Sequence, residues 1–181
     1  MEIFSTEFAE LYLVRLKKNF DDRGYFTRIM CKKILDSHGI KFDVVQINHA
    51  FSKVQGTFRG LHIQLDDAAE TKFITVVSGK VQDFALDLRK DSNTYLQVFS
   101  KILGNDDYQG IIIPRGFAHG YLTLSENVNM NYAVNNLYNS TKEISINPFQ
   151  PQILNLLEGE IKLISKKDKE GLSIKESINK I

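Results

Sequence analysis

The sequence has almost no cysteine, little proline and no tryptophan. Its 181 residues include one Cys, three Pro and no Trp. The single cysteine, Cys31, cannot form an intrachain disulfide, and one cysteine with four histidines excludes a zinc-finger framework. Proline is too scarce for a collagen-like or proline-rich disordered chain. The composition therefore predicts a globular protein of a reducing compartment.

An excess of charge of one sign and long apolar runs are also missing. Lys plus Arg number 23 and Asp plus Glu number 22, for a net charge of +1, so no overall field draws the molecule to nucleic acid or anionic lipid. No stretch approaches the roughly 20 apolar residues that span a bilayer, and the start of the chain lacks the apolar core of a signal peptide. We expect no nucleic-acid partner, no membrane partner and a cytoplasmic location.

The length fits one ordinary domain over residues 1–181. Short β-branched and aromatic runs, separated by Gly, Asn and Asp, predict eight strands. The predicted strands are Phe42–Phe51, Thr57–Gln64, Phe73–Val77, Lys80–Leu88, Tyr95–Leu103, Gly110–Ile113, Ala118–Leu124 and Val128–Val134. Eight such runs are typical of an all-β jelly roll.

Turns and helices are predicted around these strands. Ser78-Gly79 indicates a tight hairpin and 104–107 a second turn. Lys32–His38, closed by Gly39, predicts a short helix. In the C-terminal tail, about 165–181, a Ser173/Glu176 capping box predicts a helix through Ile174, Ile178 and Ile181. The basic stretch 166–169 indicates a flexible segment.

Alternation assigns faces to two polar stretches. In 59–64, His62 and Gln64 share one face, while Leu61 and Ile63 share the other. His62 is thus either a reactive group or a hydrogen-bonded core histidine. In 128–134, Tyr132 points inward with its apolar neighbours, where a phenol needs a partner.

A second histidine stands in the pattern P-x-G-x-x-H, formed by Pro114, Gly116 and His119. The pattern resembles the second signature of the cupin superfamily, but it also fits a simple turn with Gly116 at positive φ. Metal-binding cupins carry an earlier H-x-H, where this chain has His62 and Gln64. Because two imidazoles and an amide make a poor metal site, we expect no metal.

A longer series of motifs resembles the nucleotide-sugar 3,5-epimerase family, whose best-known member acts on dTDP-4-dehydrorhamnose. The matching residues run in family order: Asp22-Arg23-Gly24-Tyr25-Phe26, Val45-Gln46-Ile47-Asn48, Arg59-Gly60-Leu61-His62-Ile63-Gln64, Lys72, Gly79, Asp87-Leu88-Arg89 with Ser92, Pro114 to Gly120, Tyr132, Tyr138 and Lys167-Asp168. The resemblance implies a cupin-type jelly roll that needs no cofactor. It further implies epimerisation of a 4-keto nucleotide-diphosphate sugar at C3, C5 or both, for a deoxysugar of a surface polysaccharide.

The resemblance also implies the catalytic roles. His62 would remove the proton beside the carbonyl, and Asp168 would fix its tautomer. Lys72 would place positive charge beside the enolate oxygen, and Tyr132 would return a proton from the opposite face. Two plainer interpretations stay open: Asp168 follows Ser165 at a helix-start spacing, and Lys72 fits a solvated strand edge.

Binding roles follow for a further group of residues by the same resemblance: Arg23, Arg28, Gln46, Asn48, Arg59, His119 and Tyr138. Arginine forks suit phosphate oxygens, and Tyr138 matches the aromatic residue that stacks on the nucleotide base. His119 matches a residue near the sugar and diphosphate, though a role in the turn is also open.

The chain departs from the family at positions that bear on the substrate. Arg28 stands where the family commonly has a Glu that reads thymine, and the preferred base partner of arginine is guanine. In the run 48–52 only the second family serine, Ser52, is kept. The late W-x-D-P segment is replaced by Ile146-Asn147-Pro148. The sequence therefore leaves both a dTDP-linked and a GDP-linked sugar open.

Two other functions compete with the epimerase. One is a metal-dependent cupin isomerase or dioxygenase, which would need the missing ligand at Gln64. The other is a non-catalytic sugar-binding jelly roll, which would need neither His62 nor Tyr132. The family resemblance also implies a homodimer that exchanges N-terminal strands, for which the apolar stretch from Phe8 to Leu16 is a candidate.

Overall fold

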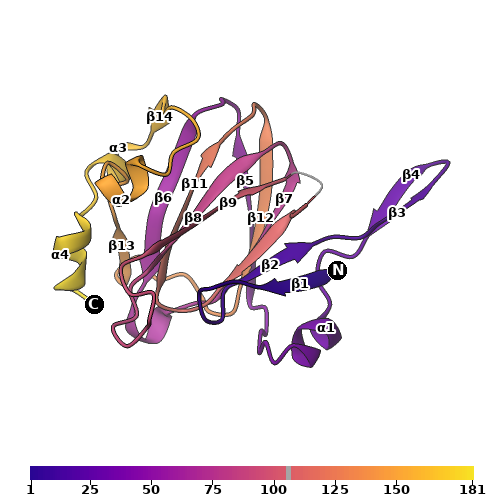
Figure 1. Ribbon diagram of the computed structural model, residues 1–181, viewed down its shortest axis with the longest axis horizontal. Coiled ribbons are helices and arrows are strands. Elements are labelled where there is room, and N and C mark those ends of the chain that lie inside the picture. The colour runs from indigo at the N-terminus through magenta and orange to yellow at the C-terminus, as the bar shows by residue number, and fades with distance from the viewer. Residues whose placement is uncertain (105–106) are drawn as a thin grey trace.

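The computed structural model describes residues 1–104 and 107–181, and its strands form two facing sheets (Figure 1). The first sheet has the order β1 (Glu2–Ser5), β2 (Tyr12–Arg15), β10 (Gly110–Ile113), β7 (Lys72–Ser78), β12 (Val128–Val134), β5 (Gln46–Ser52). The second has the order β13 (Glu143–Ser145), β6 (Thr57–Gln64), β11 (Phe117–Thr123), β8 (Val81–Asp87), β9 (Val98–Leu103), with β14 (Leu163–Ile164) parallel beside β6. The all-β prediction is confirmed.

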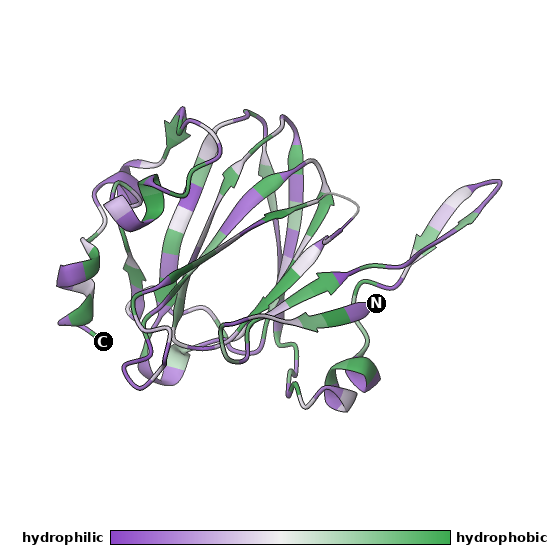
Figure 2. Cartoon of the chain, viewed as in Figure 1, coloured by the Kyte–Doolittle hydropathy of each residue, from purple (hydrophilic) through white to green (hydrophobic). Residues whose placement is uncertain are grey.

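Hydrophilic and hydrophobic residues alternate along several of these strands (Figure 2). Met130 and Val128 on β12 pack between the sheets with Tyr121 of β11. Leu61 and Ile63 of β6 share one face, as predicted, and the structure shows that this face is covered by the C-terminal segment. His62 and Gln64 therefore face the space between the sheets.

The predicted strand at 42–51 begins too early. The structure starts β5 at Gln46, whereas 42–45 is irregular. Phe42 is buried there against Phe73, with ring centroids 6.4 Å apart, and packs beside Leu35 of α1 (Lys32–Ser37). This segment covers the outer face of the first sheet, which is why its apolar residues resemble those of a strand.

Both predicted helices are present. Helix α1 ends where expected, with Gly39 at φ +73°. The Ser173/Glu176 capping box begins α4 (Ile174–Ile178). Helix α2 (Pro151–Leu154) and the 3₁₀ turn η1 (Asp66–Ala68) were not predicted.

The prediction that 166–169 is flexible is wrong. These residues form α3 (Lys166–Lys169), because the Ser165 side chain accepts a hydrogen bond from the Asp168 amide and Asp168 is buried. The charge of the segment lies on its exposed lysines, while a single carboxylate faces inward.

Both predicted turns contain a glycine in the left-handed region. Gly79 takes φ +83° between β7 and β8, which confirms the hairpin. Gly104 takes φ +92° at the start of the second turn. Asn105 and Asp106 of that turn lie outside the described residues.

A hairpin of β3 (Lys18–Asp21) and β4 (Gly24–Thr27) projects away from the two sheets (Figure 1). It exposes apolar rings, with Phe20 73% and Phe26 65% accessible. The apolar stretch before it behaves differently, because Leu13 and Val14 of β2 are buried in the core of their own chain. The hairpin therefore exposes apolar rings, whereas most of the apolar side chains from Phe8 to Leu16 are buried or half-buried.

None of the helices in the described ranges is long and apolar enough to cross a membrane.

Acid should destabilise the fold through Asp87, whose side chain is fully buried. Burial alone would raise the pKa of Asp87, but hydrogen bonds from Arg89, Ser92 and Thr94 outweigh it and lower the pKa to about 2. The stabilisation is complete above the ordinary value of 3.8 and is lost as pH falls through the folded value. Asp87→Asn should cost about 2 kcal/mol at pH 7 and flatten the stability curve below pH 4.

Urea unfolding at several pH values measures this effect. The exposed Asp91→Asn variant is the matched control and should keep the slope of the wild type. Equal slopes for the wild type and Asp87→Asn would contradict the assignment.

Candidate active site

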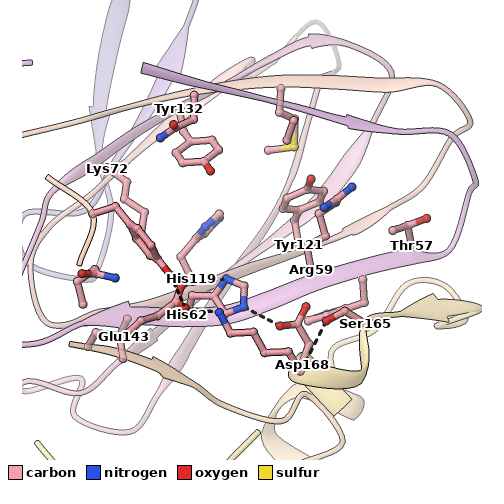
Figure 3. Close-up of a pocket in the computed structure, with 18 of the residues that line it drawn as sticks. Thr57, Arg59, His62, Lys72, His119, Tyr121, Tyr132, Glu143, Ser165 and Asp168 are labelled. Atoms are coloured by element: carbon pink, nitrogen blue, oxygen red, sulfur yellow. Dashed lines mark hydrogen bonds and ion pairs between the residues drawn. The ribbon is translucent and has the colours of Figure 1, made fainter. Parts of the chain in front are cut away.

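A cavity of about 900 Å³ lies between the sheets (Figure 3). It is lined by inward residues of β5, β6, β11 and β12 and by the segment 163–168. Most of the predicted site residues meet here: Gln46, Asn48, Arg59, His62, Lys72, His119, Tyr132, Tyr138 and Asp168. Residues far apart in the sequence thus form one site.

His62 and Asp168 form a hydrogen-bonded pair on the floor of the cavity in Figure 3. His62 Nε2 lies 2.6 Å from Asp168 Oδ1, and the His62 side chain is 32% exposed. Burial alone would raise the pKa of Asp168, but His62, the Gly60 amide and Ser165 outweigh it and lower that pKa. The ionised carboxylate accepts from Nε2–H, which leaves the Nδ1 lone pair free to take a proton.

Asp168 has a capping role as well, because its backbone amide donates to Ser165 Oγ at 3.1 Å. The helix-start interpretation and the pairing with His62 are therefore both correct. The cap fixes the backbone, and the side chain, 4% exposed, turns inward to the histidine. The helix-start spacing of Ser165 and Asp168 is thus a local sequence signal that positions Asp168 in the site.

Gly60 allows this arrangement through its missing side chain. A Cβ there would lie 2.5 Å from the His119 carbonyl oxygen, and the residue takes φ +100°. The Gly60 amide donates to Asp168 Oδ2 at 3.2 Å. This close approach brings β6, β11 and α3 together.

Glu143 lies on the other side of the imidazole. Its Oε1 is 4.0 Å from His62 Nδ1, and its Oε2 pairs with Lys167 Nζ and accepts from the Tyr138 hydroxyl at 3.2 Å. An imidazolium at position 62 would thus lie between two carboxylates.

Tyr132 faces His62 from the opposite sheet. It lies on β12, half-buried, and Figure 3 shows its hydroxyl directed into the cavity. Burial, followed by the nearby Tyr121 and acidic groups, raises the pKa of Tyr132. The phenol therefore keeps its proton at neutral pH, and it lies across the cavity from the base.

Lys72 pairs with Glu70 at the start of β7. Both side chains are largely buried, at 12% and 8% exposed, and both line the cavity. Lys72 is therefore not a solvated edge lysine. Its ammonium is held in the wall of the cavity beside a compensating carboxylate.

His119 has a carboxylate partner of its own. Its Nε2 lies 2.8 Å from Oδ2 of the fully buried Asp83. Burial raises the pKa of Asp83, and His119 offsets this only in part. His119 is the cross-strand partner of His62, so it belongs to the cavity as well as to the turn.

Arg23 and Arg28 do not line the cavity of their own chain. Arg23 sits at the tip of the projecting hairpin, 89% exposed, and binds Asp21. Arg28 follows β4 and is exposed. Both residues are thus separated from the other predicted binding residues.

Seven charged or polar residues of the cavity were not among the predicted site residues: Thr57, Gln64, Glu70, Tyr121, Glu143, Ser165 and Lys167. Lys167 stands beside Asp168 in a matched motif, which was the available signal. Glu70 and Glu143 belong to no motif, and their positions become visible only when β7 and β13 are placed around the cavity.

Across residues 1–104 and 107–181, no three His, Cys, Asp or Glu side chains are grouped so as to hold a metal ion. At the position where metal-binding cupins have a second histidine, Gln64 accepts from the Asn139 amide at 3.0 Å. The Gln64 side chain thus binds the loop after β12.

Comparison with known proteins decides the family. The family model of dTDP-4-dehydrorhamnose 3,5-epimerase matches residues 5–176. The chain belongs to the dTDP-4-dehydrorhamnose 3,5-epimerase family. It is an isomerase that acts on a nucleotide sugar.

Two curated family members show the extent of the match. The dTDP-4-dehydrorhamnose 3,5-epimerase of Shigella flexneri is 35% identical over 147 residues, covering 81% of each chain. That of Methanothermobacter thermautotrophicus is 34% identical over 162 residues, covering 87% of this chain and 85% of that protein.

Solved structures agree on the fold. The Bacillus anthracis epimerase, with TDP and PPi bound, has a TM-score of 0.90 at 32% identity and covers 96% of this chain and 99% of that one. The Legionella pneumophila enzyme, in complex with dTDP-4-keto-L-rhamnose, has a TM-score of 0.88 at 32% identity and covers 99% and 94%. The cupin-type jelly roll predicted from the motifs is confirmed.

Proposed function

We propose that this chain epimerises a dTDP-linked 4-keto-6-deoxyhexose at C3 and C5 during deoxysugar synthesis in the cytoplasm. One observation carries the proposal: a carboxylate-paired histidine and a protonated tyrosine face each other across one cavity. Inversion of a carbon needs proton removal on one face and proton delivery on the other, and the two walls provide both.

The step is written with this chain's residues. His62 Nδ1 takes the proton from the carbon beside the 4-keto group, the C–H electron pair forms the new C=C bond, and the π pair of the carbonyl moves to the C4 oxygen. Lys72 stabilises the enolate oxygen. Tyr132 then protonates the carbon from the opposite face. Before the next centre reacts, His62 releases its proton to solvent and Tyr132 takes up a proton from solvent.

The dTDP-linked sugar is supported by the ligands of the two solved relatives, TDP and dTDP-4-keto-L-rhamnose. The GDP-linked alternative depended on Arg28, which lies outside the cavity of its own chain. Arg28 directly follows the β3–β4 hairpin that is proposed below to reach a second copy, so the choice of dTDP rests on the ligands of the solved relatives and not on the place of Arg28 in its own chain. Family membership likewise favours an enzyme over the non-catalytic jelly roll.

NMR of the reaction products tests the substrate. Purified protein with dTDP-4-keto-6-deoxyglucose should yield the sugar with inverted configuration at C3 and C5, read from the proton couplings of the ring. The matched GDP-linked 4-keto sugar should remain unchanged. Turnover of the GDP sugar alone would contradict the proposal.

We further propose a homodimer in which the β3–β4 hairpin of each chain reaches the cavity of the other. The support is the exposed Phe20, Tyr25 and Phe26 on a hairpin that projects from its own chain, with Arg23 at its tip. Burial of such rings against a second copy would stabilise the pair.

Mixed dimers test this arrangement. Arg23→Ala and His62→Asn are each expected to be inactive, but coexpression should restore activity, because one cavity of the mixed dimer carries neither change. The control variant is Arg15→Ala, which changes an arginine on β2 of the sheet instead of one on the hairpin. It should be active on its own. Sedimentation of the wild type as a 20.7 kDa monomer would contradict the dimer.

A further inference from the structure

Tyr121 is a second phenol in the same cavity, and the mechanism above does not use it. It lies on β11, 6% exposed, as the cross-strand partner of Arg59 on β6. Figure 3 shows the Tyr121 ring beside Arg59, on the side of the cavity away from Lys72. A buried phenol in this position needs a partner for its hydroxyl.

The hydrogen bonds around Tyr121 leave its own proton free. Its hydroxyl lies 3.5 Å from Ser52 Oγ, at the outer limit of a hydrogen bond, and Ser52 Oγ already accepts from Arg59 Nε at 3.1 Å. If Tyr121 donated to Ser52, the buried serine proton would have no acceptor among the described residues. The satisfied arrangement has Ser52 donate to Tyr121, which turns the tyrosine proton toward the cavity.

Arg59 supplies a second donor at the same place. Its Nε binds Ser52 and its Nη2 donates to the Phe51 carbonyl at 3.0 Å, so the guanidinium is fixed at the seam between β5 and β6. Within the described residues its Nη1 has no hydrogen-bond partner. An oriented phenol and a guanidinium that share one serine form a pair of donors suited to an anionic oxygen.

The charge state of the phenol fits this role. Burial is the main cause that raises the pKa of Tyr121, which keeps the hydroxyl protonated at neutral pH. A neutral phenol beside a permanent cation stabilises an anion without adding negative charge to the site.

We propose that the Tyr121 hydroxyl donates a hydrogen bond to a phosphate oxygen of the bound nucleoside-diphosphate sugar, next to Arg59. Tyr121 is then a binding residue of the diphosphate and takes no part in proton transfer. The inference rests on the proposed function for the class of substrate, a nucleoside diphosphate sugar.

Titration calorimetry with dTDP tests the inference without any reaction. Tyr121→Phe keeps the ring and removes only the hydroxyl, so it should raise the Kd of dTDP about ten-fold. In kinetic runs it should raise KM by a similar factor and leave kcat within two-fold of the wild type. Tyr95→Phe, the same change outside the cavity, should leave Kd and KM unaltered.

The outcomes separate this inference from the proposed function. An unchanged Kd for Tyr121→Phe would overturn it, and so would a fall in kcat with an unchanged Kd, because the phenol would then act on the sugar. Wild-type protein that binds dTDP but does not epimerise would contradict the proposed activity and leave the binding test intact. Wild-type protein that does not bind dTDP would overturn both.

Discussion

Replacing His62 by asparagine should lower kcat about a thousand-fold, because the chain loses the group that removes the proton. Asparagine has nearly the size of the imidazole but no basic nitrogen, so the base beside Asp168 is lost while the cavity keeps its shape. Steady-state kinetics with dTDP-4-keto-6-deoxyglucose measure the fall, and calorimetry should show that dTDP still binds within a few-fold.

The control is His38→Asn, which changes an exposed histidine at the end of α1. It should keep wild-type kinetics. A His62→Asn enzyme that retains more than about a tenth of the wild-type kcat would remove His62 from the role of base.

Tyr132→Phe should separate proton removal from inversion. The net rate of epimerisation should fall about a hundred-fold or more, because no acid remains on the opposite wall. His62 is intact in this variant, so it can still remove a proton and return one to the same face. In D2O the substrate should therefore gain deuterium with its configuration retained, faster than product appears.

NMR of both isotope content and ring configuration reads this separation. Tyr95→Phe again serves as the matched control. Loss of exchange in parallel with loss of product would show that Tyr132 is needed for proton removal itself, contrary to the assigned role.

The parts of the fold that the sequence predicted correctly are those with local signals. Period-two alternation placed Tyr132 inward and put His62 on the face opposite to Leu61 and Ile63. The end of α1 follows from a glycine stop and the start of α4 from a capping box. The same local signal was noted at Ser165, but the run of lysines after it was interpreted as a flexible segment and not as α3. The lysine-rich composition reflects the exposed side chains of α3 and gives no sign that Asp168 is buried.

The site itself depends on pairings across long sequence separations. His62 and Asp168 are 106 residues apart and were connected only through family resemblance. Glu143 and Lys167 meet at the cavity because β13 pairs with β6 and α3 follows β14, which no periodicity encodes. Arg28 could not be placed from its residue type, because it lies outside the cavity of its own chain.

Deuterium incorporation by the wild-type enzyme tests the central claim most directly. The protein is incubated in D2O with dTDP-4-keto-6-deoxyglucose, and deuterium at C3 and C5 is read by NMR. The account predicts solvent deuterium at both carbons of the inverted product, because His62 and Tyr132 serve each centre in turn. A product that keeps its original hydrogen at both carbons, or a substrate that shows no exchange at all, would contradict it.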